Sequence, residues 1–163
     1  MSEDIATLRV SMMRRLTGLA VMFLLGGLLL YIAMARPPAE LGWRVFLLAL
    51  GGVTLTLAEA MRRATARTLH LTEEGLFDSD GQVLARIEDI REIERGLFAL
   101  KPSNGFTLKL KSAAPRAWAP GVWWRLGRRL GVGGVTSAAQ AKAMAEIMTA
   151  MLVTRQHADQ TQD

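Results

Sequence analysis

Long uncharged stretches dominate the first part of the chain. The twenty residues 16–35, LTGLAVMFLLGGLLLYIAMA, contain no charged side chain. A helix of about 20 apolar residues crosses the hydrocarbon core of a bilayer. We therefore predict a transmembrane helix over 16–35; the alternative is a buried helix of a soluble core.

A second apolar run, VFLLALGGVTLTLA at 45–58, follows after a short gap. Its fourteen residues alone are too few to span a bilayer. Arg44 can extend its charged end toward the interface, and the apolar pattern continues to Met61, which predicts a second span over 41–61.

The link between the two runs is short and contains Pro37 and Pro38. Proline ends a helix, so the two spans (16–63 as a unit) are predicted to form an antiparallel hairpin. Each span carries a pair of glycines at a similar predicted depth, where close packing of the two backbones is possible. The pairs are Gly26 with Gly27 and Gly51 with Gly52. The alternative is that they reflect the ordinary frequency of glycine in membrane helices.

Arginine is distributed unequally around the predicted hairpin, with six on the outer flanks and two in or near the link. The six are Arg9, Arg14, Arg15, Arg62, Arg63 and Arg67, and the two are Arg36 and Arg44. Because positive flanks stay in the cytoplasm, both termini are predicted to be cytoplasmic. The alternative is a signal peptide cleaved at Ala33-Met34-Ala35, which would remove the first span.

From residue 67 onward the pattern changes to short alternating runs. Leu69 and Leu71 alternate with polar residues, DSDG at 78–81 indicates a turn, and GFTLKLK at 105–111 alternates again. The isoleucines of 87–96 are spaced by three and fit a helix, although the neighbouring runs favour a sheet that continues through this segment.

The end of the chain has helical periodicity. Ser137 and Gln140 match a capping box. One apolar stripe follows at steps of three and four: Ala141, Met144, Ala145, Met148, Met151 and Leu152. We predict a cytoplasmic N-terminal tail over 1–15, a cytoplasmic domain of strands with a closing helix over 66–155, and a disordered tail over 156–163.

Composition narrows the chemistry. The chain has 163 residues, of which 50% are hydrophobic, and it has no cysteine, which excludes disulfides and thiolate sites. Its net charge of +5 favours acidic partners such as anionic lipid or nucleic acid. Charge also divides along the domain, with eight acids in 73–94 and nine basic residues without an acid in 95–145. The alternative is that sheet formation interleaves these halves and cancels the field.

The segment GVWWRLGRRLG at 121–131 combines two tryptophans with three arginines. As a short helix over 122–130, it would turn Trp123, Leu126 and Leu130 toward the core and leave an opposite tryptophan–arginine face. That face comprises Trp124, Arg125, Arg128 and Arg129. Three interpretations remain: contact with the membrane surface, structural packing, or binding of a protein or nucleic acid. The nearby membrane tether favours lipid, so no nucleic-acid partner is expected.

Together, the hairpin, LHLTEEGLFDSDG at 69–81, IEDIREIERG at 87–96, the basic segment and the closing helix resemble small bacterial two-span membrane proteins that carry a pleckstrin-homology-like domain. The matching positions are Leu69, Leu71, Thr72, Gly75, Leu76, Asp89 and Ile90. Ile87 stands where many relatives have tryptophan. The resemblance implies an inner-membrane location and an α+β fold, namely a transmembrane hairpin followed by a bent antiparallel β-sandwich or barrel closed by a C-terminal helix.

Phosphoinositide binding, known for eukaryotic pleckstrin domains, is not carried over to this chain. The first strand loop of the domain contains Glu73, Glu74, Asp78 and Asp80, which would repel a phosphate headgroup.

No pattern of catalytic or metal-ligating residues is evident. The histidines fall on a strand and in the terminal tail, and GVGG at 131–134 lacks the Lys-Ser/Thr of a phosphate loop. We therefore expect a non-enzymatic protein without cofactor or metal. Its predicted role is an interaction or scaffolding module at the inner leaflet, with anionic headgroups or a membrane protein as partner. The alternative role is an accessory or assembly subunit of a larger membrane complex. The sequence leaves the oligomeric state open.

Overall fold

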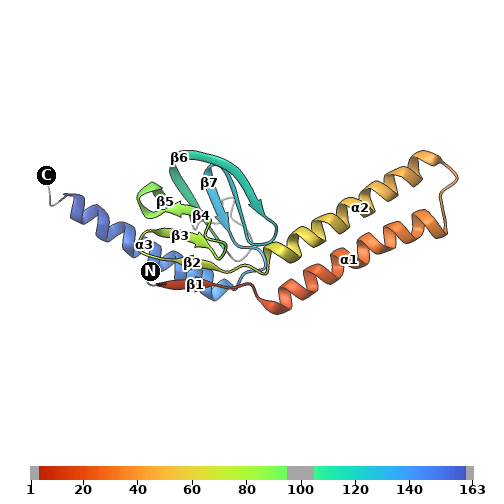
Figure 1. Ribbon diagram of the computed structural model, residues 1–163. Coiled ribbons are helices and arrows are strands. Elements are labelled where there is room, and N and C mark those ends of the chain that lie inside the picture. The colour runs from red at the N-terminus through yellow and green to blue at the C-terminus, as the bar shows by residue number, and fades with distance from the viewer. Residues whose placement is uncertain (1–3, 95–104, 161–163) are drawn as a thin grey trace.

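The chain forms a long helical hairpin that projects from one end of a two-sheet domain (Figure 1). The computed structural model describes residues 4–94 and 105–160. The elements in chain order are β1 (Ala6–Leu8), α1 (Met12–Ala35), α2 (Leu41–Ala64), β2 (Leu69–Leu71), β3 (Gly75–Asp78), β4 (Val83–Arg86), the 3₁₀ turn η1 (Ile87–Asp89), β5 (Ile90–Glu94), β6 (Phe106–Ala119), β7 (Trp123–Val132) and α3 (Ala138–Gln160).

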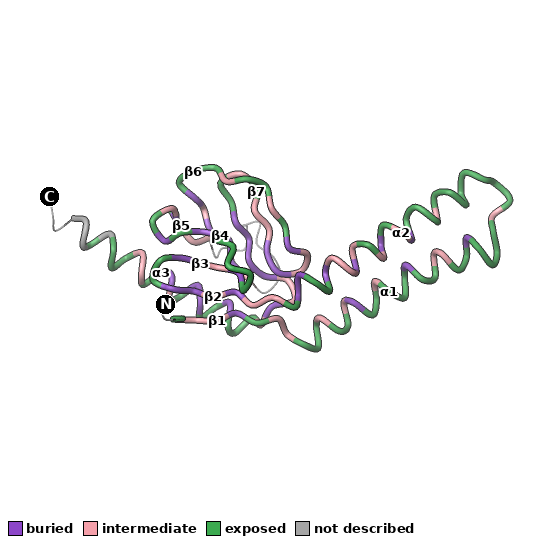
Figure 2. The backbone as a smooth tube through the Cα atoms, in the orientation of Figure 1, coloured by how far each residue is buried: buried purple, intermediate pink, exposed green. Residues whose placement is uncertain are grey.

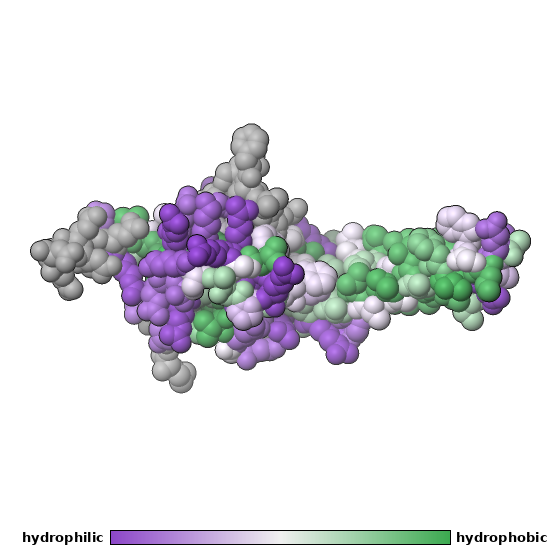
Figure 3. Space-filling model, turned by 90° about the horizontal axis from the view of Figure 1, so that it is seen from above, coloured by the Kyte–Doolittle hydropathy of each residue, from purple (hydrophilic) through white to green (hydrophobic). Residues whose placement is uncertain are grey.

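The two helices of the hairpin are each 24 residues and apolar enough to cross a membrane. Their length corresponds to roughly 36 Å at 1.5 Å per residue, which exceeds a hydrocarbon core of about 30 Å. Large apolar side chains point outward along both helices. On the face seen in Figure 3 the hairpin is largely hydrophobic, and hydrophilic residues lie at its tip. Both helices extend beyond the predicted spans, α1 toward its N-terminal end and α2 toward its C-terminal end.

The hairpin is inserted between two adjacent strands of one sheet. β1 precedes α1, β2 follows α2, and the two strands pair antiparallel with Leu8 opposite Leu69. Leu8 is 1% exposed and belongs to the core. Residues 6–8 are thus part of the folded domain and not of the tail predicted for 1–15. The sequence did not predict this strand, because three residues are too short a pattern to be recognised.

The domain consists of two antiparallel sheets and a helix. One sheet has the order β1-β2-β3-β4 and the other the order β5-β6-β7. The segment 87–94, which fitted either a helix or a strand, divides into the turn η1 and the strand β5.

The predicted short helix over 122–130 is wrong, because this segment is strand β7. It pairs with β6 over nearly its whole length, from Trp123 opposite Ala119 to Val132 opposite Phe106. Gly127 interrupts the segment with a φ of +59°, a conformation that fits an irregular strand and not a regular α-helix. Trp123 and Leu130 are both buried although they are an odd number of residues apart, because the β6–β7 register shifts between them.

α3 packs the predicted apolar stripe into the core. Ala141, Met144, Ala145 and Met148 are buried against the sheets, and the buried residues form one continuous interior (Figure 2). The helix continues to Gln160, so it extends into the segment predicted as a disordered tail.

Candidate functional site: the base of the helical hairpin

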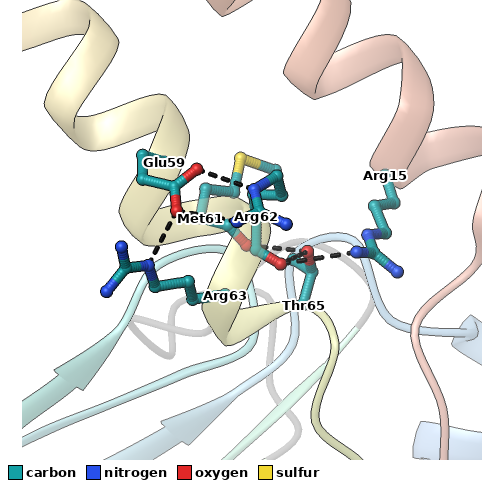
Figure 4. Close-up of polar contacts among 6 residues, drawn as sticks. All are labelled: Arg15, Glu59, Met61, Arg62, Arg63 and Thr65. Carbon is teal, nitrogen blue, oxygen red and sulfur yellow. Dashed lines mark hydrogen bonds and ion pairs between the residues drawn. The ribbon is translucent and has the colours of Figure 1, made fainter.

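The two helices of the hairpin are joined to each other where they enter the domain (Figure 4). Arg15 Nη2 of α1 donates a hydrogen bond to the carbonyl oxygen of Arg62 in α2 at 3.4 Å. Glu59 accepts from Arg62 Nε and Arg63 Nε, both at 2.7 Å. Charged groups thus begin in both helices at the same end of the apolar surface.

The sheet domain also packs directly against this base. The Met61 side chain lies between the helices and the β6–β7 turn, since a Cβ added at Gly18 or at Gly121 would come within 3.1 Å or 3.2 Å of Met61 Cε. On the other side, Val10 forms an isolated antiparallel bridge with Thr136, and Arg14 Nη1 donates to the Thr136 carbonyl at 3.1 Å.

The connection from α2 to β2 is fixed by an ion-pair cluster. Arg67 bonds Asp78 at 3.1 Å and Asp80 at 2.9 Å, and the Asp78 side chain is completely buried. Four acids of this loop were expected from the sequence to repel a phosphate headgroup. Two of them, Asp78 and Asp80, form ion pairs with Arg67. The connection, the bridge and the Met61 contact give the hairpin three attachments to the domain.

A cavity of about 300 Å³ opens at this base, between the end of β1, the first turn of α1 and the start of α3. Arg9 and Arg14 line it together with Ser137, Ala138 and Gln140. Among the described residues, the lining of this cavity includes two arginines and no acid.

The start of α3 differs in detail from the predicted capping box. Ser137 precedes the helix, and its carbonyl accepts the first helical bond from Ala141. Gln140 Oε1 accepts from the backbone N–H of Arg9 at 3.0 Å, while the Ser137 N–H donates to the Arg9 carbonyl. In a capping box Gln140 would accept from the Ser137 N–H, but that N–H donates to the Arg9 carbonyl. Gln140 instead connects α3 to the N-terminal segment.

The two predicted glycine pairs are divided by the helix contact. Gly26 and Gly51 are buried and face each other, whereas a Cβ added at Gly27 or Gly52 would meet nothing within 4 Å. Ala33 and Ala58, each seven residues further along its helix, are also buried. Small residues at a seven-residue spacing thus lie in the interface, and one glycine of each predicted pair is among them.

Of the predicted tryptophan–arginine face, Trp124 and Arg125 are engaged within the domain. The Trp124 ring covers Gly131, where a Cβ would collide with the indole. Arg125 Nε donates to the Pro115 carbonyl at 3.0 Å, and Nη1 donates to the Leu84 carbonyl at 3.2 Å. Arg125 therefore links the β6–β7 hairpin to the edge strand β4 of the other sheet.

The rest of this segment is exposed. Arg128 and Arg129 lie on the surface of β7, and Leu126, placed on the core face in the helical interpretation, is 54% exposed. Trp123 is 3% exposed and Leu130 is buried, as expected for those two. Trp118, which the sequence analysis did not single out, is 62% exposed and pairs with Trp124 across the strands. The position of Trp118 follows from the pairing of β6 with β7 in one long hairpin, which local sequence patterns do not reveal.

Charge is partly interleaved within the three-stranded sheet β5-β6-β7, in the sense of the alternative in which sheet formation brings the acidic and basic halves together. Lys109 on β6 lies 2.6 Å from Glu94 and 3.3 Å from Glu92 on β5. The hydrogen bond from Lys109 holds the pKa of the Glu94 carboxyl below its ordinary value. The acidic strand and part of the basic segment therefore neutralise each other locally.

A second cavity, of about 380 Å³, lies between the β2–β3 turn, β4 and α3. Glu73, Glu74 and Glu88 line it opposite Arg86 and Arg155. Glu88 forms long ion pairs with both arginines, at 3.6 Å and 3.9 Å. Within residues 4–94 and 105–160, no group of three His, Cys, Asp or Glu side chains is placed to hold a metal ion.

Comparison of the chain with protein-family models, with curated proteins and with solved structures gives no significant match.

Proposed function

We propose that this protein is a non-enzymatic membrane protein whose two-sheet domain is held at the membrane surface as an interaction or scaffolding module. The observation that carries the proposal is the insertion of the apolar hairpin between β1 and β2. Both ends of the hairpin are built into one domain, so the domain cannot move away from the surface at which the helices emerge.

Insertion of the hairpin into a bilayer is supported by the distribution of side chains along it. The outward surface is apolar, and charged residues occur at the base and around the link. Near the link, the rings of Trp43 and Phe46 meet edge to face at 5.7 Å, and Tyr31 is exposed. Tryptophan and tyrosine are enriched at membrane interfaces, so these residues fit the level of the far headgroups.

The cytoplasmic face of a bacterial inner membrane is the proposed location of the domain. The arginine distribution favours the base of the hairpin on the cytoplasmic side. Because β1 pairs with β2, the N-terminal strand and the rest of the domain lie together at the same end of the hairpin. Cleavage after Ala35 would remove Leu8 from the core and β1 from its sheet, which argues against the signal-peptide alternative.

We also propose that the two-sheet domain is a pleckstrin-homology-like domain. Its support is the arrangement of four plus three antiparallel strands with a C-terminal helix packed on them. In this arrangement the transmembrane hairpin replaces the connection between the first two strands, and it does not simply precede the domain.

The part of the domain proposed to touch the bilayer surface is the β6–β7 hairpin near its turn. Gly121 in that turn contacts Met61 at the end of α2, and Trp118 lies three residues earlier. An exposed tryptophan close to the membrane side suits the interfacial region better than the packed Trp124 does.

Photo-crosslinking from two surfaces tests the proposed role against the alternative of a complex subunit. A photoreactive residue at Arg128 samples the exposed domain surface, and one at Leu24 or Val53 samples the outer surface of the hairpin. A specific protein adduct from position 128 supports an interaction module. A specific adduct confined to positions 24 and 53, together with a stoichiometric partner in mild detergent, would instead support the accessory subunit.

A further inference from the structure

The cavity at the base of the hairpin concentrates positive charge from two parts of the chain. Arg9 follows β1 and Arg14 lies in the first turn of α1, and both line the same space of about 300 Å³. Arg14 is oriented by its bond to the Thr136 carbonyl. The Arg9 side chain makes no hydrogen bond or ion pair with any residue in the described part of the chain, so its guanidinium is available to a ligand.

The start of α3 adds to the same field. Ala138 and Gln140 are in the first turn, whose backbone N–H groups have no acceptor inside a helix. The positive end of the helix dipole therefore points toward the cavity that the arginines line. Two guanidinium groups beside a helix N-terminus are suited to an oxyanion such as phosphate.

The position of the cavity indicates the source of that phosphate. Arg14 is only two residues from the start of α1, and the apolar surface of the hairpin begins directly beyond it. If the hairpin spans the bilayer, which this step takes from the proposed function, the cavity lies at the level of the cytoplasmic headgroups. We propose that the cavity binds the phosphate group of an anionic phospholipid.

The test uses the full chain purified in a neutral detergent at low salt, with thermal unfolding as the readout. Short-chain phosphatidylglycerol is the anionic probe, short-chain phosphatidylcholine the zwitterionic probe and inorganic phosphate the free anion. We expect a saturable rise of the unfolding midpoint with phosphatidylglycerol alone. An equal rise with inorganic phosphate would overturn the lipid assignment, and an equal rise with phosphatidylcholine would overturn the anion site.

Three variants assign the effect to the cavity. Arg9→Gln should weaken the apparent affinity about fivefold and Arg9→Gln with Arg14→Gln about 25-fold, equivalent to about 1 kcal/mol per arginine near a membrane surface. Arg91→Gln, at an exposed position on β5, a strand far from the α1–α2 hairpin in Figure 1, is the matched control and should bind as the natural chain does. Unchanged affinity in Arg9→Gln and in the double variant would refute the site.

Two additions keep the outcome decisive. If Arg14→Gln disturbs the fold through loss of the Thr136 contact, Arg9→Gln and Arg14→Lys carry the test. The Arg9 side chain has no hydrogen-bond or ion-pair partner in the described part of the chain, and Arg14→Lys keeps the positive charge. Flotation of the same preparation with liposomes tests membrane insertion separately. A chain that binds phosphatidylglycerol at the cavity but fails to float would refute the proposed function, while a floating chain without anion selectivity would refute only the site.

Discussion

Gly26 and Gly51 face each other across the hairpin, and a side chain added at either position would press on the opposite helix. A Cβ at Gly26 would lie 3.4 Å from the Gly51 carbonyl oxygen and 2.7 Å from Leu55 Cδ2. A Cβ at Gly51 would lie 3.2 Å from the Gly26 carbonyl oxygen and 2.9 Å from Leu30 Cδ2. The backbones therefore approach closely at this one level, while the glycines next in sequence face away.

Replacement of Gly51 by leucine should separate the helices. Overpacking of a close contact typically costs about 1–3 kcal/mol, so the thermal unfolding midpoint in detergent should fall. Gly52→Leu is a matched control, because a Cβ there meets nothing within 4 Å and should leave the midpoint near its natural value. Equal effects at both positions would show that the helices pack through another face.

Trp123 and Trp118 should respond oppositely to truncation. Trp123→Ala should destabilise the fold by about 3–5 kcal/mol, because the ring is buried in the core. Trp123→Phe should cost much less, since the indole N–H has no hydrogen-bond partner in the described part of the chain. Trp118→Ala should change stability by less than about 0.5 kcal/mol, as is usual for surface positions. Denaturant unfolding followed by circular dichroism measures all three, and a large loss for Trp118→Ala would contradict the assigned positions.

Arg125 is predicted to be a structural residue and Arg128 a surface residue. Arg125→Gln removes the bonds to the carbonyls of Pro115 and Leu84 and should cost about 1 kcal/mol, as a partly exposed charged donor does. Arg128→Gln should leave the unfolding midpoint unchanged. Hydrogen exchange should also report faster opening of β4 in Arg125→Gln alone; similar exchange in both variants would mean that Arg125 does not hold the sheets together.

The ion pair between Lys109 and Glu94 predicts a defined pH dependence. The folded-state pKa of Glu94 is lowered below the ordinary value of 4.5 by the Lys109 hydrogen bond. Its stabilisation is therefore present above that ordinary value and is lost as the pH falls through the lowered folded-state pKa. The difference in stability between the natural chain and Lys109→Met should shrink as the medium is acidified below 4.5. A difference that stays constant with pH would contradict the pairing.

The features with long or strongly periodic signals were predictable from sequence. The uncharged runs indicated both helices of the hairpin, and the apolar stripe from Ala141 indicated α3, because both patterns repeat over many residues. The core position of Trp123 was also correct, although a strand and not a helix places it there.

The missed features depend on contacts between distant residues. β1 has three residues and is recognisable only through its pairing with β2, so a fragment starting at residue 66 would lack an edge strand and Leu8. The cationic cavity brings Arg9 and Arg14 to Ser137 across more than 120 residues of sequence, and no local pattern indicates that approach. The role of Arg125 likewise depends on carbonyl groups of another sheet.

Cysteine labelling tests the central claim most directly, because the natural chain has no cysteine. Ala39→Cys places one thiol at the exposed link of the hairpin, and Arg91→Cys places one on the sheet domain. With a membrane-impermeant maleimide, we predict labelling of position 39 in cells whose inner membrane is intact, and of position 91 only after that membrane is permeabilised. Labelling of both positions from the same side of an intact membrane would contradict a spanning hairpin with the domain at its cytoplasmic base.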